Sequence, residues 1–91
     1  MDIEDYSAIP EHMMRGIRGY IEEGWQLGGF LYAIFTHDLW GAFGKADHIN
    51  LPLIQTYIHY IHWELPATCH GSKELVEAWI MKIREKNDAK N

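Results

Sequence analysis

One stretch of the chain limits the possible folds more than any other. It reads GGFLYAIFTHDLWGAF (residues 28–43), the densest apolar segment of the sequence, and it carries Thr36, His37 and Asp38 in its middle. When this segment is projected at about 100° per residue, apolar side chains occupy almost the whole circumference of a helix. A helix of this kind is normally buried centrally or shared with a second subunit. We therefore expect the segment to form a central helix that is part of a homo-oligomer interface.

Four helices are expected along the chain, and the residues that begin and end them are the clearest local signals. Pro10 suits the first turn of the first helix, where a missing N–H costs nothing, and Gly24 suits its end. Asn50 is a good N-cap for the third helix, which Pro66 ends. Ser72 caps the fourth helix. These signals predict an all-α fold, a compact bundle of about four helices.

Length and composition fit one helical domain. The 91 residues lie near the low end of what folds alone, so association of subunits is a reasonable stabilising device. The composition is 47% hydrophobic, which indicates a packed core and not a disordered chain. We expect residues 1–91 to form a single domain, with a loose acidic lead-in at residues 1–9 and a frayed tail at residues 87–91.

Charge and cysteine content argue against several classes of partner and environment. The formal net charge of -5 argues against dedicated DNA or RNA binding, which needs clustered Lys and Arg. Cys69 is the single cysteine, so no internal disulfide is expected and an intracellular setting is predicted. The N-terminus shows no signal-peptide pattern, and polar residues interrupt the long apolar run, so no membrane span is predicted. The expected location is the cytoplasm.

Asp38 is the first candidate for a functional residue, because a buried carboxylate costs several kcal/mol unless it is paired or hydrogen-bonded. In a continuous helix it projects into the most apolar arc. One interpretation is structural: Asp38 pairs with Lys45 or Arg18, or bonds to the N–H groups of a neighbouring helix. The other is that Asp38 lines a polar pocket and accepts hydrogen bonds from a base or sugar. General acid–base catalysis needs a second titrating group, and His37 points about 100° away on a helix, so no catalytic residue is predicted.

Histidines are frequent enough to make a metal site worth testing. His59 and His62 are three residues apart on one helix face, a spacing that can chelate a metal. No CxxC, HExxH or EF-hand pattern supplies further ligands. We therefore expect solvated or hydrogen-bonded histidines, with no bound metal and no cofactor.

Two helix starts and a few side chains are the remaining candidates for ligand binding. Gly28-Gly29 and Gly71-Ser72-Lys73 each place small residues before the exposed first N–H groups of a helix, which is either ordinary capping or an anion site. Trp25, beside the glycine pair, can stack on a flat ligand. Arg18 has a guanidinium suited to phosphate, although an ion pair with a nearby glutamate is the plainer interpretation. The predicted ligand-binding residues are Arg18, Trp25, Asp38, Lys45, Ser72 and Lys73.

Two longer segments resemble a known family. They read IPEHMMRGIRGYIEEG…GGFLYAIFTHDLWGAFGKADHIN and LPATCHGSKELVEAWI, and together they extend over most of the chain, from residue 9 to residue 80. In the pattern G-x-F-L…D-L…A-D…N followed by G-S…W, the chain is similar to small proteins encoded by tailed phages and prophages. His37 stands where the similar proteins more often carry Asn, and His70 stands where they carry Trp.

Phage proteins of this size include small, non-catalytic oligomers that sequester the nucleotide second messengers of bacterial antiviral signalling. By analogy with these proteins in size and role, we expect a phage protein, not an enzyme, that binds a phosphate-bearing nucleotide such as a cyclic dinucleotide and so inhibits host defence. We expect the phosphates near Lys45, Lys73 and Arg18, gathered from one subunit or from several. The alternative is a phage regulatory or interaction protein that binds a host protein through an exposed helix face.

Overall fold

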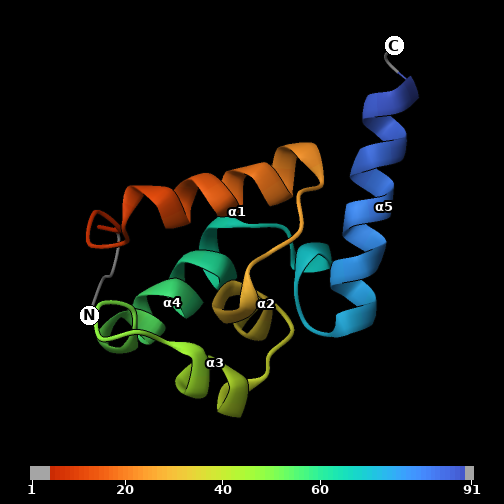
Figure 1. Cartoon of the computed structure of the whole chain (residues 1–91). Helices are drawn as coiled ribbons and strands as arrows, with labels where there is room; N and C mark the ends of the chain where they lie inside the picture. Colours follow the sequence, from red (N-terminus) through yellow and green to blue (C-terminus); the bar gives the residue numbers. More distant parts are fainter. Residues whose placement is uncertain (1–4, 90–91) are drawn as a thin grey trace.

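Five α-helices contain most of residues 5–89, which are the residues that the computed structural model describes (Figure 1). The all-α fold class predicted from the sequence is confirmed, and no strand occurs in the described range. The number of helices is five and not four, because the expected central helix is divided in two. The helices are α1 (Glu11–Glu23), α2 (Gly29–Phe35), α3 (Leu39–Lys45), α4 (Ile54–Glu64) and α5 (Lys73–Ala89), with short 3-10 helices at Leu51–Leu53 and Ala67–Cys69.

The division falls in the polar triplet inside the apolar segment. The Thr36 hydroxyl donates to the carbonyl of Tyr32 at 2.8 Å, one turn back, and His37 has a left-handed backbone with φ of 61°. Asp38 then begins α3 as its N-cap, with a carboxylate oxygen 2.9 Å from the amide nitrogen of Gly41. Short polar side chains that bond to nearby backbone compete with a continuing helix. The single continuous helix predicted here is therefore wrong, and the chain turns back on itself.

The two halves of the expected central helix are buried to very different extents. Five of the seven residues of α2 are buried, among them Phe30 and Phe35. Phe30 packs edge-to-face on Tyr57 of α4, and Phe35 packs edge-to-face on Tyr20 of α1. In α3, by contrast, only Ala42 is buried. The prediction of a central apolar helix therefore holds for α2, whereas α3 lies on the surface.

α1 ends where the sequence predicts, and α5 packs beside that end (Figure 1). Gly24 follows α1 in the left-handed conformation, with φ of 71°, which a glycine adopts without steric cost. The carbonyl of Gly24 accepts a hydrogen bond from Arg84 Nε at 3.0 Å, and that of Glu22 accepts one from Asn87 Nδ2 at 3.2 Å. These contacts tie the end of α5 to α1. The helix continues to Ala89, into the expected frayed tail, and the last two residues of that tail lie outside the described range.

The expected loose lead-in is only partly described. Residues 1–4 lie outside the described range, so the structure does not bear on them. Further along, Ile9 is buried in the core, and the ring of Tyr6 packs edge-on against that of Tyr60 in α4. The part of the lead-in nearest to α1 is therefore packed against the domain.

Asn50 has a different role from the predicted one. It makes no capping hydrogen bond, and the 3-10 helix of residues 51–53 separates it from α4. Its buried side chain instead accepts a hydrogen bond from the hydroxyl of Tyr57 at 2.6 Å. Burial of Tyr57 and the nearby Asp47 raise the pKa of this hydroxyl to about 12, so it remains a donor at neutral pH. Asn50 thus satisfies a buried polar group of α4.

A membrane-spanning helix needs about 20 predominantly apolar residues. The longest described helix, α5, has 17 residues and carries several charged side chains. No helix within the described residues combines the length and the apolarity needed to cross a membrane.

Candidate functional site

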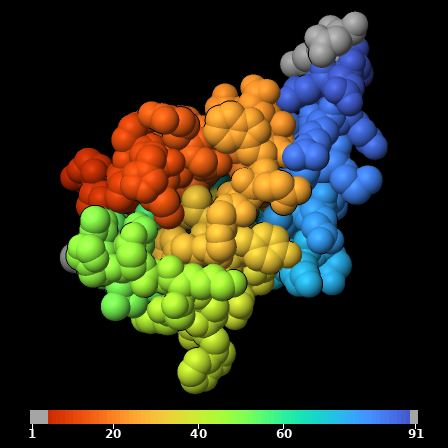
Figure 2. Space-filling view, in the orientation of Figure 1, coloured from red at the N-terminus to blue at the C-terminus, as the bar shows by residue number. Residues whose placement is uncertain are grey.

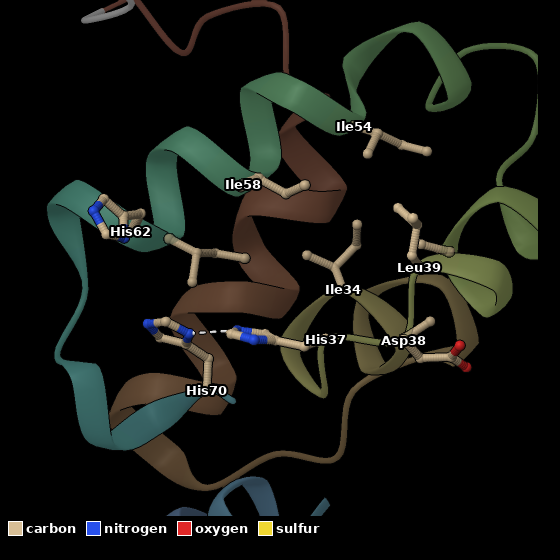
Figure 3. Close-up of a pocket in the computed structure, with 11 residues that line it drawn as sticks. Ile34, His37, Asp38, Leu39, Ile54, Ile58, His62 and His70 are labelled. Atoms are coloured by element: carbon tan, nitrogen blue, oxygen red, sulfur yellow. Dashed lines mark hydrogen bonds between the residues drawn. The ribbon is translucent and has the colours of Figure 1, made fainter. Parts of the chain in front are cut away.

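A pocket opens on the surface between α2, α3 and α4, and the loop before α5 closes one end of it (Figure 3). Its volume is about 250 Å³. Most of the wall is aliphatic, and three imidazoles lie at one end. An apolar cavity with a few polar groups is the usual form of a small-molecule site. The lining residues are Ala33, Ile34, His37, Asp38, Leu39, Ala42, Ile54, Ile58, Ile61, His62 and His70.

Two of these imidazoles are in direct contact. Nε2 of His37, in the turn between α2 and α3, lies 2.9 Å from Nδ1 of His70, and the dashed line in Figure 3 marks this hydrogen bond. One ring nitrogen donates and the other accepts, so the contact requires at least one neutral imidazole. Burial, and then the neighbouring His37 and His62, lower the pKa of His70.

The backbone around this pair is held by hydrogen bonds of its own. The amide of Gly71 donates to the carbonyl of Phe35 at 2.8 Å, which holds the loop before α5 against the end of α2. Gly71 has a φ of 131°, a conformation that favours glycine. The hydroxyl of Tyr20 donates to the carbonyl of Cys69 at 2.6 Å and ties the same loop to α1. The loop that carries His70 is therefore positioned by two different helices.

Asp38 is the one predicted ligand residue that lines the pocket, but it is not the buried carboxylate expected from the sequence. Its side chain is exposed, and Figure 3 shows its oxygens turned away from the cavity. One oxygen accepts a hydrogen bond from the amide of Gly41, so the carboxylate caps α3. Among the described residues it forms no ion pair with Lys45 or Arg18. The expectation of a buried Asp38 is wrong because the helix breaks at this residue.

Lys45 lies at the other end of the α2–α3 hairpin from the histidines. Its Cδ is 3.3 Å from the position that a Cβ would take at Gly29, so the aliphatic part of the side chain covers the start of α2. A helix of seven residues aligns few peptide dipoles, so the positive charge at this end comes mainly from the Lys45 ammonium. The glycine pair and Lys45, two separate candidates in the sequence, are therefore side by side.

Arg18 and Trp25 both lie outside the pocket. Arg18 Nη2 is 2.7 Å from a carboxylate oxygen of Glu11, so the plainer interpretation, an ion pair on the surface of α1, is confirmed. Trp25 is half exposed, and a Cβ at Gly19 would collide with its indole, so the missing side chain of Gly19 makes room for the ring. The exposed part of Trp25 stays open to a flat partner, but it does not line the pocket that holds the histidines.

Ser72 and Lys73 also lie outside the pocket, at the start of α5. The hydroxyl of Ser72 accepts a hydrogen bond from the amide of Leu75 at 3.1 Å, as expected for a helix cap. Lys73 is exposed in the first turn. Ordinary capping accounts for this helix start, and the predicted phosphate contacts there stay a prediction.

The surface of α3 exposes three large apolar side chains that sequence reasoning does not find, because a continuous helix would bury them. Leu39, Trp40 and Phe43 are 60%, 89% and 52% exposed. In Figure 2 the yellow-green segment that contains α3 projects at the lower edge of the molecule. Large apolar side chains gathered on an exposed surface mark sites of association or ligand binding. The polar triplet before α3 is the signal in the sequence that points to this outcome.

Neither a metal centre nor a reactive thiol is apparent in the described part of the chain. No group of three or more His, Cys, Asp or Glu side chains between residues 5 and 89 is arranged to hold a metal ion. His59 and His62, the pair with chelating spacing, both pack against the ring of Trp63. Cys69 is buried, and burial raises the pKa of its thiol to about 11, so the nucleophilic thiolate is scarce at neutral pH.

No family model matches the chain, and no similar chain is found among curated proteins or solved structures.

Proposed function

We propose that this protein binds a small phosphate-bearing nucleotide, such as a cyclic dinucleotide, and sequesters it without breaking a bond. In the setting implied by the resemblance to phage proteins, removal of such a signal inhibits bacterial antiviral defence. The observation that carries the proposal is the pocket between α2, α3 and α4, which combines aliphatic walls with hydrogen-bonding imidazoles. The functional unit that we propose is a homo-oligomer.

The chemistry of the pocket suits a nucleobase. Ile34, Leu39 and Ile58 offer aliphatic surface to a flat ring, and the nitrogens of His62 and His70 offer hydrogen bonds to its polar edge. Pockets that enclose a whole small-molecule ligand usually have about 300–1,000 Å³. The volume of about 250 Å³ is below that range, so the pocket takes one base and leaves the sugar and phosphate groups outside.

Phosphates outside the pocket need a local positive charge, because a protein with a net charge of -5 repels anions on average. Lys45 meets this need best, since it ends the helix whose Ala42 lines the pocket. Ala42 and Lys45 are three residues apart, on one face of α3 and about 4.5 Å along its axis. Arg18 is already in an ion pair and Lys73 lies at the start of α5, so we propose that they contribute from a second subunit.

A nucleotide screen tests this proposal. Thermal unfolding is measured with nucleoside monophosphates, cyclic mononucleotides and cyclic dinucleotides, with inorganic phosphate as the reference anion. A ligand at one hundred times its dissociation constant adds about 2.7 kcal/mol to the free energy of unfolding. In a domain of this size the melting temperature then rises by roughly 10 °C or more. No rise with any nucleotide would contradict the proposal.

A pair of isoleucine variants tests the location. Ile58→Glu places a charge at the mouth of the pocket on a side chain that is 49% exposed, so the fold should be retained. Ile49→Glu is the matched control, because Ile49 is 52% exposed and does not line the pocket. We expect calorimetric titration to show binding to the parent and the Ile49 variant and none to the Ile58 variant. Equal binding by all three proteins would place the ligand elsewhere.

The exposed side of α3 favours a second candidate function, the binding of a host protein. Trp40 is almost fully exposed. Its burial against a partner would stabilise an interface substantially, because tryptophan buries a large apolar area. The proposed homo-oligomer covers this side with another copy of the chain, whereas a monomer leaves it free for a different protein. Light scattering at micromolar concentration separates the two candidates. A strict monomer that also fails the nucleotide screen would favour the host-protein function.

A further inference from the structure

The contact between His37 and His70 joins parts of the chain that are 33 residues apart. His37 lies in the turn between α2 and α3, and His70 lies in the loop before α5. Both residues also line the histidine end of the pocket (Figure 3). A change in this contact therefore acts on the pocket and on the junction between the α2–α3 hairpin and α5.

The hydrogen bond depends on the protonation state of both rings. A neutral imidazole has one donor and one acceptor nitrogen, so a pair with at least one neutral ring can share a hydrogen bond. Two protonated rings have only donors, and nitrogens 2.9 Å apart then repel each other. Histidine changes its charge between about pH 5 and pH 8. The contact is therefore lost only when both rings carry a proton on each nitrogen.

The groups around His70 do not compensate a positive charge there. His62 of α4 lines the same end of the pocket, so the neighbours of His70 on two sides are further imidazoles. Asp38 follows His37 in the chain, but its carboxylate caps α3. Among the described residues, no carboxylate is hydrogen-bonded to either ring of the pair. On the side of α5, the first charged residue is Lys73, which is itself cationic.

The turn that carries His37 also needs contacts to hold it. A left-handed backbone is unfavourable for a side chain with a Cβ, and His37 has a φ of 61°. The neighbouring hydrogen bond, from the amide of Gly71 to the carbonyl of Phe35, crosses the same junction at 2.8 Å. Loss of the imidazole contact removes one of the interactions that keep the turn and the loop together. Hydrogen exchange at the Gly71 amide therefore reports whether the turn and the loop stay in contact.

We propose that the His37–His70 pair is a pH-sensitive latch on the pocket, which holds its histidine end closed near neutral pH and releases it in mild acid. In the closed form the two facing ring nitrogens share a hydrogen bond. In the open form both rings are cations, and the loop before α5 is free to move away from the α2–α3 turn. The latch is a property of the chain alone and does not depend on nucleotide binding.

Proton binding by His70 is linked to stability with a definite sign. Burial and the adjacent imidazoles lower the pKa of His70 below the ordinary value of about 6.5, so the unfolded chain takes up this proton more readily than the folded chain. The contribution of neutral His70 to the free energy of unfolding is therefore complete above about pH 6.5 and is lost as the pH falls. Tyr20 and Cys69 contact the same loop but stay neutral in this range, because burial raises the pKa of both.

Amide hydrogen exchange of the ligand-free protein tests the latch. The protection factor of the Gly71 amide, which is corrected for the intrinsic effect of pH, is compared at about pH 7.5 and about pH 5. We expect it to fall severalfold in acid, because loss of the imidazole contact lets the loop before α5 open more often. In His37→Asn the fall should disappear, because asparagine does not titrate and tolerates a left-handed backbone. His12→Asn, an exposed histidine of α1, is the matched control and should keep the fall.

Two results would overturn the latch. One is a His37→Asn protein in which the protection of Gly71 falls in acid as much as in the parent. The other is measured on the parent protein, so it remains informative if His37→Asn does not fold. The nitrogen chemical shifts of the imidazoles report which rings are protonated, and the protection of Gly71 is measured on the same samples. We expect complementary tautomers of the two rings in the closed form and two protonated rings in the open form. Unchanged protection of Gly71 once both rings are protonated would contradict the proposal.

Discussion

Asp38 provides a sharp test of the fold, because a continuous helix and the observed hairpin assign it different roles. In the structure it is exposed, and it accepts one hydrogen bond from the amide of Gly41 at 2.9 Å. Asparagine caps a helix about as well as aspartate does, whereas alanine cannot accept this bond. We therefore expect Asp38→Asn to be nearly neutral and Asp38→Ala to lower the free energy of unfolding.

The magnitude follows from the small size of the capped element. Loss of an N-cap residue costs about 0.5–2 kcal/mol. α3 has seven residues and buries only Ala42, so we expect a loss of about 0.5–1 kcal/mol, in the lower half of that range. In a domain of this size, 1 kcal/mol changes the melting temperature by about 4–8 °C. Removal of one member of a buried ion pair would instead cost about 3–5 kcal/mol.

Urea unfolding followed by tryptophan fluorescence resolves differences of this size. The parent and both Asp38 variants are compared at one pH and one salt concentration. Asp88→Ala is the matched control, because it removes an exposed carboxylate of α5 that caps nothing. Equal destabilisation by asparagine and alanine, or a loss of about 3 kcal/mol for either substitution, would refute the capping role.

Three further predictions concern association, the thiol and the charge of the ligand. Trp40→Ser should convert the proposed oligomer to a monomer in light scattering, whereas Met81→Ser, which removes an exposed apolar side chain of α5, should not. An oligomer that Trp40→Ser leaves unchanged would move the interface away from α3. Burial raises the pKa of the Cys69 thiol to about 11, so this thiol should resist a thiol reagent at neutral pH and react at once in urea. Fast reaction in the native protein would contradict its burial. Lys45→Ala should weaken nucleotide binding and reduce the dependence of binding on salt, whereas the control Lys86→Ala should change neither. The same affinity in both variants would show that Lys45 is not part of the site.

Local chemistry made several features of the fold predictable from the sequence. Gly24 ends α1 in the left-handed conformation, and the hydroxyl of Ser72 caps α5, because both roles depend on one residue and its immediate neighbours. The pair of Arg18 with Glu11 follows in the same way from their places on one helix. Features of this kind need no knowledge of the tertiary structure.

The residues just before α3 also carry a local signal for a helix break, but the apolar residues around them dominate the hydrophobic pattern of the segment. Thr36 and Asp38 are both types that bond to nearby backbone, and this is how they act in the structure. Helical projection presupposes a continuous helix, so it placed Asp38 in a buried arc and α3 in the interior. The exposure of Trp40 is the direct consequence of the break.

The pocket could not have been predicted from spacing along the chain. Its histidine end consists of His37, His62 and His70, which come from a turn, a helix and a loop. No local pattern relates residues 33 positions apart, and their contact depends on how the α2–α3 hairpin meets the loop before α5. Only Asp38 was both predicted as a ligand residue and found in the pocket wall, and there its carboxylate points away from the cavity.

Methyl NMR tests most directly whether a nucleotide base enters the pocket between α2, α3 and α4, as we propose. Protein with labelled isoleucine methyl groups is titrated with cyclic dinucleotides, and each methyl signal is followed to saturation. The proposal predicts changes at Ile34, Ile54 and Ile58, which line the pocket, and none at Ile49 or Ile83, which do not. Pocket methyl signals that stay in place throughout the titration would contradict it.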